Sequence, residues 1–180
     1  MHPPIQPSTQ AIQIPSEPAP IKFPMPRPRR YRDIRTTTIP ASPDAIWQAV
    51  LDQAEALGSP RYARMLGCRD TQAHGPRPLE AGSTVPGFQV TTARPPDQLV
   101  LEGVHRFSAY TLTFRLVPDN LVPDGPATRL EAHTNATFPG VRGALYRLLV
   151  IESRLHKLAT WSIVERIRRR VLTPHDHPRT

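Results

Sequence analysis

His105 is the residue of this sequence best suited to acid–base chemistry in an apolar site. It lies in the run Leu99 to Phe107, whose composition and alternation predict a β-strand. Because strand side chains alternate between faces, His105 shares a face with Leu101, whereas Glu102 and Arg106 point to the other face. An imidazole has an unperturbed pKa near neutrality, so an inward His105 could act as a general acid or base. The alternative is an ordinary, hydrogen-bonded strand residue.

A second predicted strand, Thr128 to Phe138, carries two more ionisable side chains. By the same two-residue period, Leu130 and Thr134 face inward, so Glu131 and His133 are predicted to point outward. His105 therefore gains no inward ionisable neighbour from this strand. That arrangement favours a binding role over a catalytic one.

Metal, phosphate and thiol chemistry find little support in the sequence. The run His175-Asp176-His177 lies in a Pro-flanked tail, where flexible ligands would have to be ordered at an entropic cost. No Gly-rich phosphate loop, Gly-x-Ser-x-Gly elbow, paired-Cys zinc site or His-Glu-x-x-His pattern is present. The single cysteine, Cys68, permits no internal disulfide and has no predicted activating partner. We expect neither a metal ion nor a cofactor.

The elements that must position these residues follow a Pro-rich N-terminal segment. Nine of the 23 prolines lie within the first 28 residues, a density that excludes a helix or a central strand. Residues 1–30 are therefore predicted to be a disordered, basic tail. They lack the continuous apolar stretch of a secretory signal, and no run of about 18 apolar residues could span a bilayer. We expect a soluble, cytoplasmic protein.

One strand and two helices are predicted next. The strand runs from Tyr31 to Ile39, and Ser42 and Pro43 then form a favourable start for a helix over residues 43–57. Gly58 is predicted to end that helix. A short helix over residues 60–68 is expected to close at Gly67.

An antiparallel sheet and a long helix complete the prediction. The expected strands span residues 85–92, 99–107, 110–117 and 128–138, with connections too short for parallel crossovers. Residues 69–80 are expected to form a loop or an irregular edge strand. A helical apolar stripe extends from about residue 141 to 171. The predicted domain therefore covers residues 31–172, and residues 173–180 form a flexible tail.

The net charge of +8 is carried by the ends of the chain. Residues 1–32 hold five Lys and Arg against one Glu, residues 154–180 hold seven against two acidic residues, and residues 33–153 hold eleven against twelve. A neutral domain body argues against specific nucleic-acid recognition. Four arginines could make weak contact with an anionic membrane, although cations solvated at a helix C-terminus are the favoured explanation: Arg166, Arg168, Arg169 and Arg170.

The order of these elements resembles that of a known superfamily. The run Ile39-Pro40-Ala41-Ser42-Pro43-Asp44-Ala45-Ile46-Trp47 is similar to the strand-to-helix transition of the START-like, birch-pollen-allergen-like proteins (SRPBCC), which include a polyketide cyclase/dehydrase-like branch. Residues 99–116 and 128–140, and the helix after them, are similar to its later elements. The resemblance covers roughly residues 31–172. It implies an α+β helix-grip fold, in which a curved antiparallel sheet wraps around a long C-terminal helix.

The resemblance also implies a cavity for a hydrophobic small molecule between the sheet and the terminal helix. Residues on the inward faces of the predicted strands, together with two aromatic residues of the terminal helix, are then the candidate ligand contacts. They are Leu101, His105, Leu112, Phe114, Leu130, Thr134, Tyr146 and Trp161.

Three functional hypotheses remain open. The first is a non-catalytic protein that binds a hydrophobic small molecule such as a lipid or polyketide. The second is an enzyme of the polyketide cyclase/dehydrase type that uses His105 as its acid or base. The third is a regulatory or membrane-associated protein that acts through its basic ends.

Overall fold

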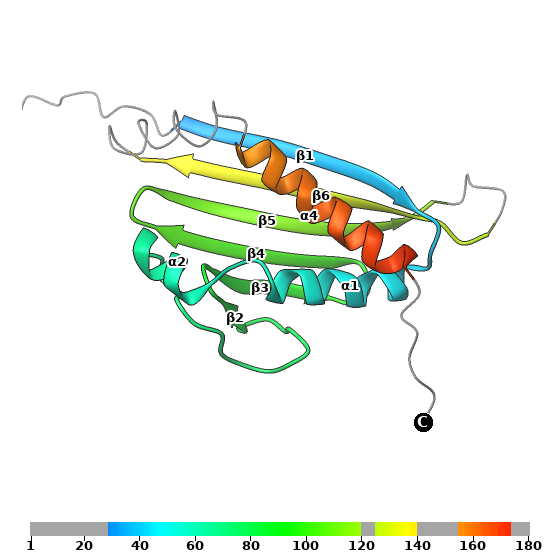
Figure 1. Ribbon diagram of the computed structural model, residues 1–180, viewed down its shortest axis with the longest axis horizontal. Helices are drawn as coiled ribbons and strands as arrows, with labels where there is room; N and C mark the ends of the chain where they lie inside the picture. Colours follow the sequence, from blue (N-terminus) through cyan, green and yellow to red (C-terminus); the bar gives the residue numbers. More distant parts are fainter. Residues whose placement is uncertain (1–28, 120–124, 140–154, 174–180) are drawn as a thin grey trace, which may run out of the picture.

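A computed structural model describes residues 29–119, 125–139 and 155–173. Its strands form one six-stranded antiparallel sheet in the order β1-β6-β5-β4-β3-β2, and α1 and α4 pack beside each other on one face, the inner face (Figure 1). The fold class is α+β with a curved sheet, as the sequence predicts. In chain order the elements are β1 (Arg29–Ile39), α1 (Pro43–Glu55), α2 (Pro60–Leu66), β2 (Thr84–Val85), β3 (Phe88–Arg94), β4 (Gln98–His105), β5 (Ser108–Pro118), β6 (Thr128–Phe138) and α4 (Leu155–Leu172).

The predicted cap at the start of α1 and the predicted glycine at the end of α2 are both confirmed. The Ser42 hydroxyl accepts a hydrogen bond from the Ala45 amide at the start of α1, and α2 ends at Gly67 with a φ of +67°. The predicted end of α1 at Gly58 is wrong, because α1 ends at Glu55. Gly58 instead lies so close to the Pro86 carbonyl oxygen that a Cβ atom would collide with it. The absence of a side chain at Gly58 therefore allows the backbone to pass close to Pro86.

The predicted strand faces are confirmed. Leu101 on β4 and Leu130 on β6 are fully buried on the inner face. On the outer face, Glu131 is bonded to His133 at 3.0 Å and to Arg129 at 3.1 Å. The hydrogen bond from His133, helped by the one from Arg129, lowers the pKa of the Glu131 carboxyl. These ionisable groups lie away from the interior.

The turn between β4 and β5 is tighter than predicted. The expected strand continued to Phe107, whereas β4 ends at His105, which pairs directly with Ser108. The His105 Nδ1 atom accepts a hydrogen bond of 3.1 Å from the Phe107 amide, so the imidazole caps the turn as an Asn or Asp side chain often does. This local bond, which alternation alone does not reveal, ends the strand two residues early.

The terminal helix is described from Leu155 onward, and the rest of its predicted span, residues 141–154, lies outside the described residues. So do residues 1–28 and 174–180 of the predicted tails. Val164 and Ile167 are buried against the sheet and α1, whereas Leu158 is 60% exposed. Over the described ranges, no helix is long and apolar enough to cross a membrane.

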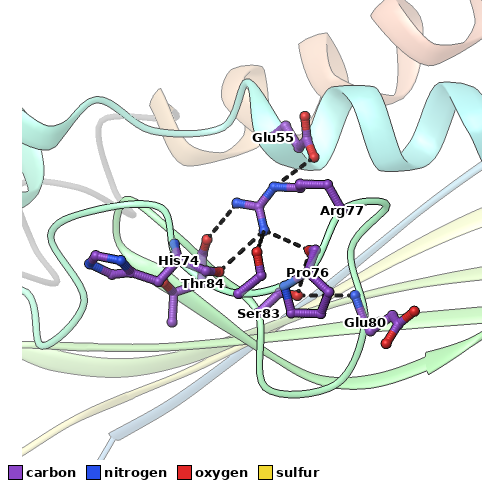
Figure 2. Close-up of polar contacts among 8 residues, drawn as sticks. Glu55, His74, Pro76, Arg77, Glu80, Ser83 and Thr84 are labelled. Carbon is purple, nitrogen blue, oxygen red and sulfur yellow. Dashed lines mark hydrogen bonds and ion pairs between the residues drawn. The ribbon is translucent and has the colours of Figure 1, made fainter.

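Arg77 organises the loop between α2 and β2 (Figure 2). Its guanidinium donates to four carbonyl oxygens: those of Pro76 at 2.9 Å, Thr84 at 3.0 Å, His74 at 3.2 Å and Gly75 at 3.4 Å. Its Nε atom also pairs with Glu55 at the end of α1 at 3.0 Å. The loop leads into β2, so Arg77 ties the start of β2 to the end of α1.

Replacing Arg77 with Gln should lower the free energy of unfolding by about 1–2 kcal/mol, because four carbonyl groups lose a charged donor. Glu55→Gln should cost less than about 1 kcal/mol, since the ion pair is largely exposed to solvent. Urea unfolding measures both values. Hydrogen exchange should also quicken within residues 69–84 in the Arg77 variant. Equal losses of stability in the two variants would contradict the structural role of the carbonyl contacts.

Candidate ligand-binding pocket

A cavity of about 430 Å³ lies between α2, α4 and the inner face of β4, β5 and β6. α2 and the residues just before it supply one wall, and Pro86 to Phe88 supply a second. The sheet contributes His105 and Ser108 at one end and Leu112 and Thr134 further along. Most of the lining is apolar, and no described lining residue is an Asp, Glu, Lys or Arg.

The cavity occupies the part of the inner face that α1 leaves uncovered. At the other end of the sheet, Ile46 and Val50 of α1 belong to one core cluster with Leu99 of β4 and Leu116 of β5. That end is therefore filled by side chains. α1 stops at Glu55, so the His105 end of the same face is covered by the short α2 and by α4.

Tyr110 shapes the floor of the cavity. It pairs across β4 and β5 with Gly103, where a Cβ atom would collide with the Tyr110 ring. The Tyr110 hydroxyl donates a 2.7 Å hydrogen bond to the Gly87 carbonyl oxygen, and its ring meets Phe88 edge-on at 5.0 Å. The absence of a side chain at Gly103 thus allows Tyr110 to lie over β4 and reach the β2–β3 turn.

Replacing Gly103 with Ala should lower the free energy of unfolding by about 2 kcal/mol, because the new methyl group must displace both Tyr110 and the Gly87 carbonyl. The matched control is Val104→Ala on the same strand, whose side chain points outward and is 37% exposed. The control should cost less than about 1 kcal/mol. Urea unfolding of the two variants gives the comparison, and equal stabilities would show that the close approach at Gly103 carries no constraint.

His105 is half-buried in the cavity wall, and its ring bonds to two of the described residues. Nδ1 accepts from the Phe107 amide, and Nε2 lies 2.9 Å from the Ser108 hydroxyl. A neutral imidazole has one protonated nitrogen, so an Nδ1 that accepts requires the proton on Nε2. His105 therefore donates to Ser108 and cannot remove its proton. This geometry excludes a Ser108 nucleophile activated by His105.

The cavity environment keeps two of its titratable lining groups neutral, the His105 imidazole and the Cys68 thiol. Burial lowers the pKa of His105, and protonation of Nδ1 would also break the bond from Phe107. Burial raises the pKa of the Cys68 thiol, and a hydrogen bond with Tyr110 offsets only part of that effect. At neutral pH the cavity therefore presents an uncharged imidazole and an uncharged thiol.

The lowered pKa of His105 makes stability dependent on pH in a defined direction. The unfolded chain, with an ordinary histidine pKa near 6.5, takes up this proton before the folded chain does. Stability should therefore fall as the pH drops below about 6.5, and His105 should add no pH dependence well above that value. His105→Gln should reduce the loss of Tm between about pH 7.5 and about pH 5.5. An NMR titration of the His105 ring with a midpoint at or above 6.5 would contradict this expectation.

The predicted ligand contacts divide into two groups on the inner face. Three of them line the cavity: His105, Leu112 and Thr134. Three others are at most 1% exposed and belong to the filled core near α1: Leu101, Phe114 and Leu130. Alternation identifies the face of a strand and does not indicate how far along that face α1 extends.

The two predicted contacts from the terminal helix are not among the described cavity residues. Trp161 is 56% exposed on α4, and Tyr146 lies outside the described residues. α4 instead contributes Thr160 and Ile163 to the cavity. The walls from Tyr62 on α2 and from the Pro86–Phe88 turn were not predicted, and the Pro-Gly pair was the only sequence signal for that turn.

The basic residues near the end of α4 are partly paired. Glu165 lies 2.8 Å from Arg169 and 3.6 Å from Arg168, and Arg170 lies 3.4 Å from Asp52 of α1. Contact of this helix end with an anionic membrane stays a prediction. Within the described residues, no three His, Cys, Asp or Glu side chains gather where they could hold a metal ion.

Comparison with known proteins identifies the fold through structure alone. No family model matches the sequence, and no curated protein matches it either. Truncated norcoclaurine synthase from Thalictrum flavum is 13% identical and superposes with a TM-score of 0.53 over 82% of this chain and 96% of the synthase. Ara h 8.0201 is 10% identical, with a TM-score of 0.52 over 81% of this chain and all of that protein (100%).

A second structure of the Thalictrum flavum synthase, in complex with dopamine and hydroxybenzaldehyde, is similar at 13% identity and a TM-score of 0.50, over 85% of this chain and 91% of the synthase. The chain therefore shares the fold of these proteins, which is the helix-grip fold that its sequence predicts.

Proposed function

We propose that this protein binds a neutral, largely apolar small molecule in the cavity between α2, α4 and β4 to β6. The observation that carries the proposal is the 430 Å³ space on a sheet face whose other end is densely packed. Small-molecule sites in proteins commonly have volumes of about 300–1,000 Å³ and mostly apolar walls with a few polar groups. The described lining has this character.

The absence of charge among the described lining residues supports a neutral ligand. A buried ion without a partner would carry a large desolvation cost, so a charged ligand group would have to remain at the cavity mouth. The complex of the norcoclaurine synthase with dopamine and hydroxybenzaldehyde gives a precedent for aromatic molecules bound to a protein of this fold.

The hydrogen bonds and protonation states of the cavity side chains favour binding over catalysis of the polyketide cyclase/dehydrase type. His105 donates to Ser108 and has its Nδ1 occupied by a backbone amide, so neither ring nitrogen is free to act as a base. The Cys68 thiol is protonated because burial raises its pKa. The described lining supplies no carboxylate or amine to replace them.

Filling the cavity should abolish binding. Ala136 lies on the inner face of β6 in the cavity wall, and Ala136→Phe places a ring in that space. Asn135→Phe is the matched control, because the same ring on the next residue of β6 points to the exposed outer face. The probe is the neutral dye N-phenyl-1-naphthylamine, followed by its fluorescence. Wild-type protein and Asn135→Phe should bind it with one-to-one saturation, and Ala136→Phe should bind at least about tenfold more weakly.

Circular dichroism establishes that each variant is folded before binding is compared. If Ala136→Phe does not fold, Ala63→Leu fills the same cavity from α2 and should weaken binding of the dye in the same way. Undiminished binding by a folded, cavity-filling variant would refute the proposed site. No saturable binding by the wild-type protein would refute the proposed function.

A further inference from the structure

The cavity wall contains a short chain of hydrogen bonds whose direction is set by the backbone. The Phe107 amide can only donate, and it donates to His105 Nδ1 at 3.1 Å. The neutral imidazole then carries its proton on Nε2 and donates to the Ser108 Oγ atom, 2.9 Å away. Burial lowers the pKa of His105, which keeps the ring in this neutral form at physiological pH.

The direction of this chain determines what Ser108 can do. A serine hydroxyl has one proton and two lone pairs, and His105 takes up one lone pair. The remaining proton of Ser108 needs an acceptor, because the side chain is only 4% exposed and a buried donor left unsatisfied is costly. The part of the chain that the structure describes supplies no acceptor for it, and Ser108 lines the cavity.

A second hydroxyl on the same face has no hydrogen-bond partner among the residues that the structure describes. Thr134 is 5% exposed, lines the cavity from β6, and its Oγ1 atom is buried without a hydrogen bond among the described residues. Thr134 pairs with Leu112, four residues along β5 from Ser108. At about 3.3 Å per residue the two hydroxyls are separated by roughly 13 Å along the sheet. The apolar stretch of the cavity therefore lies between two polar points.

We propose that Ser108 selects the ligand, and that the cavity takes a neutral, largely apolar carbonyl compound whose oxygen accepts a hydrogen bond from the Ser108 hydroxyl. The Phe107–His105 pair is the positioning device that turns Ser108 into a donor. A hydrocarbon of the same shape as the carbonyl compound has no oxygen acceptor, so it leaves the hydroxyl proton of Ser108 without a hydrogen bond. The inference rests on the proposed function and adds a chemical class to the ligand.

The first test needs no ligand. In ¹⁵N-labelled wild-type protein at neutral pH, long-range ¹H–¹⁵N NMR spectra should show His105 with an unprotonated Nδ1 and a protonated Nε2. The opposite tautomer, or a charged ring, would overturn the inference. Neither result would affect the proposal that the cavity binds an apolar molecule.

The second test compares two probes that differ only at the acceptor. Fluorenone and fluorene share one ring skeleton, and only fluorenone carries a carbonyl oxygen. Affinities follow from displacement of N-phenyl-1-naphthylamine from the full-length protein. Ser108→Ala should weaken the binding of fluorenone by about fivefold to twentyfold and should not weaken the binding of fluorene, because only fluorenone loses a hydrogen bond. Ser108→Cys, with a similar volume and a weak donor, should give an intermediate loss for fluorenone alone.

The pattern of failure separates the two proposals. If both probes bind and Ser108→Ala weakens them equally, or weakens neither, the selection by Ser108 is refuted and the binding function stands. If neither probe nor the dye binds the wild-type protein, the proposed function is refuted and the inference with it. Circular dichroism tests whether each variant is folded. If Ser108→Ala does not fold, Ser108→Cys is the decisive variant.

Discussion

The packing of Tyr110 on Gly103 is the constraint on which the cavity depends. A β-carbon at Gly103 would occupy the place of the tyrosine ring, so the ring can lie over β4 only because that position has no side chain. From there the hydroxyl reaches the Gly87 carbonyl oxygen and the ring meets Phe88, which joins the β2–β3 turn to the centre of the sheet. The His105 ring lies 5.4 Å from Tyr110, so the same packing borders the polar end of the cavity.

The inner face of the sheet is divided between a packed core and a cavity, and the length of α1 sets the boundary. Ile46 and Val50 are fully buried at one end of the face. Beyond Glu55 the chain turns through Gly58, which approaches Pro86, and the short α2 roofs the remaining area without filling it. Tight packing is thus concentrated at the α1 end of the domain, while the other end contains the cavity.

The fold could be predicted because local sequence patterns determine its helix ends and strand faces. The Ser42 cap, the left-handed Gly67 and the alternation along β6 each depend on neighbouring residues alone. The predicted faces of β4 and β6 are correct for the same reason.

The cavity was predictable only in part, because its walls depend on contacts between distant segments. Alternation places Leu101 and His105 on one face, and only the end of α1 decides that Leu101 is core and His105 is wall. The contact of Pro86 with Gly58 and the pairing of His105 with Ser108 depend on loop geometry, for which a sequence pattern gives no register. The sequence therefore could not predict that Ser108 is the hydrogen-bond partner of His105.

The central claim is that the inner face holds an open, mostly apolar space near Tyr110 and His105. Xenon enters apolar cavities without specific contacts, so a crystal of the protein under xenon pressure tests the claim directly. We predict xenon density between α2, α4 and the inner face of β4 to β6, beside Tyr110 and Leu112. Side chains that fill this space, with no xenon bound there, would contradict the account.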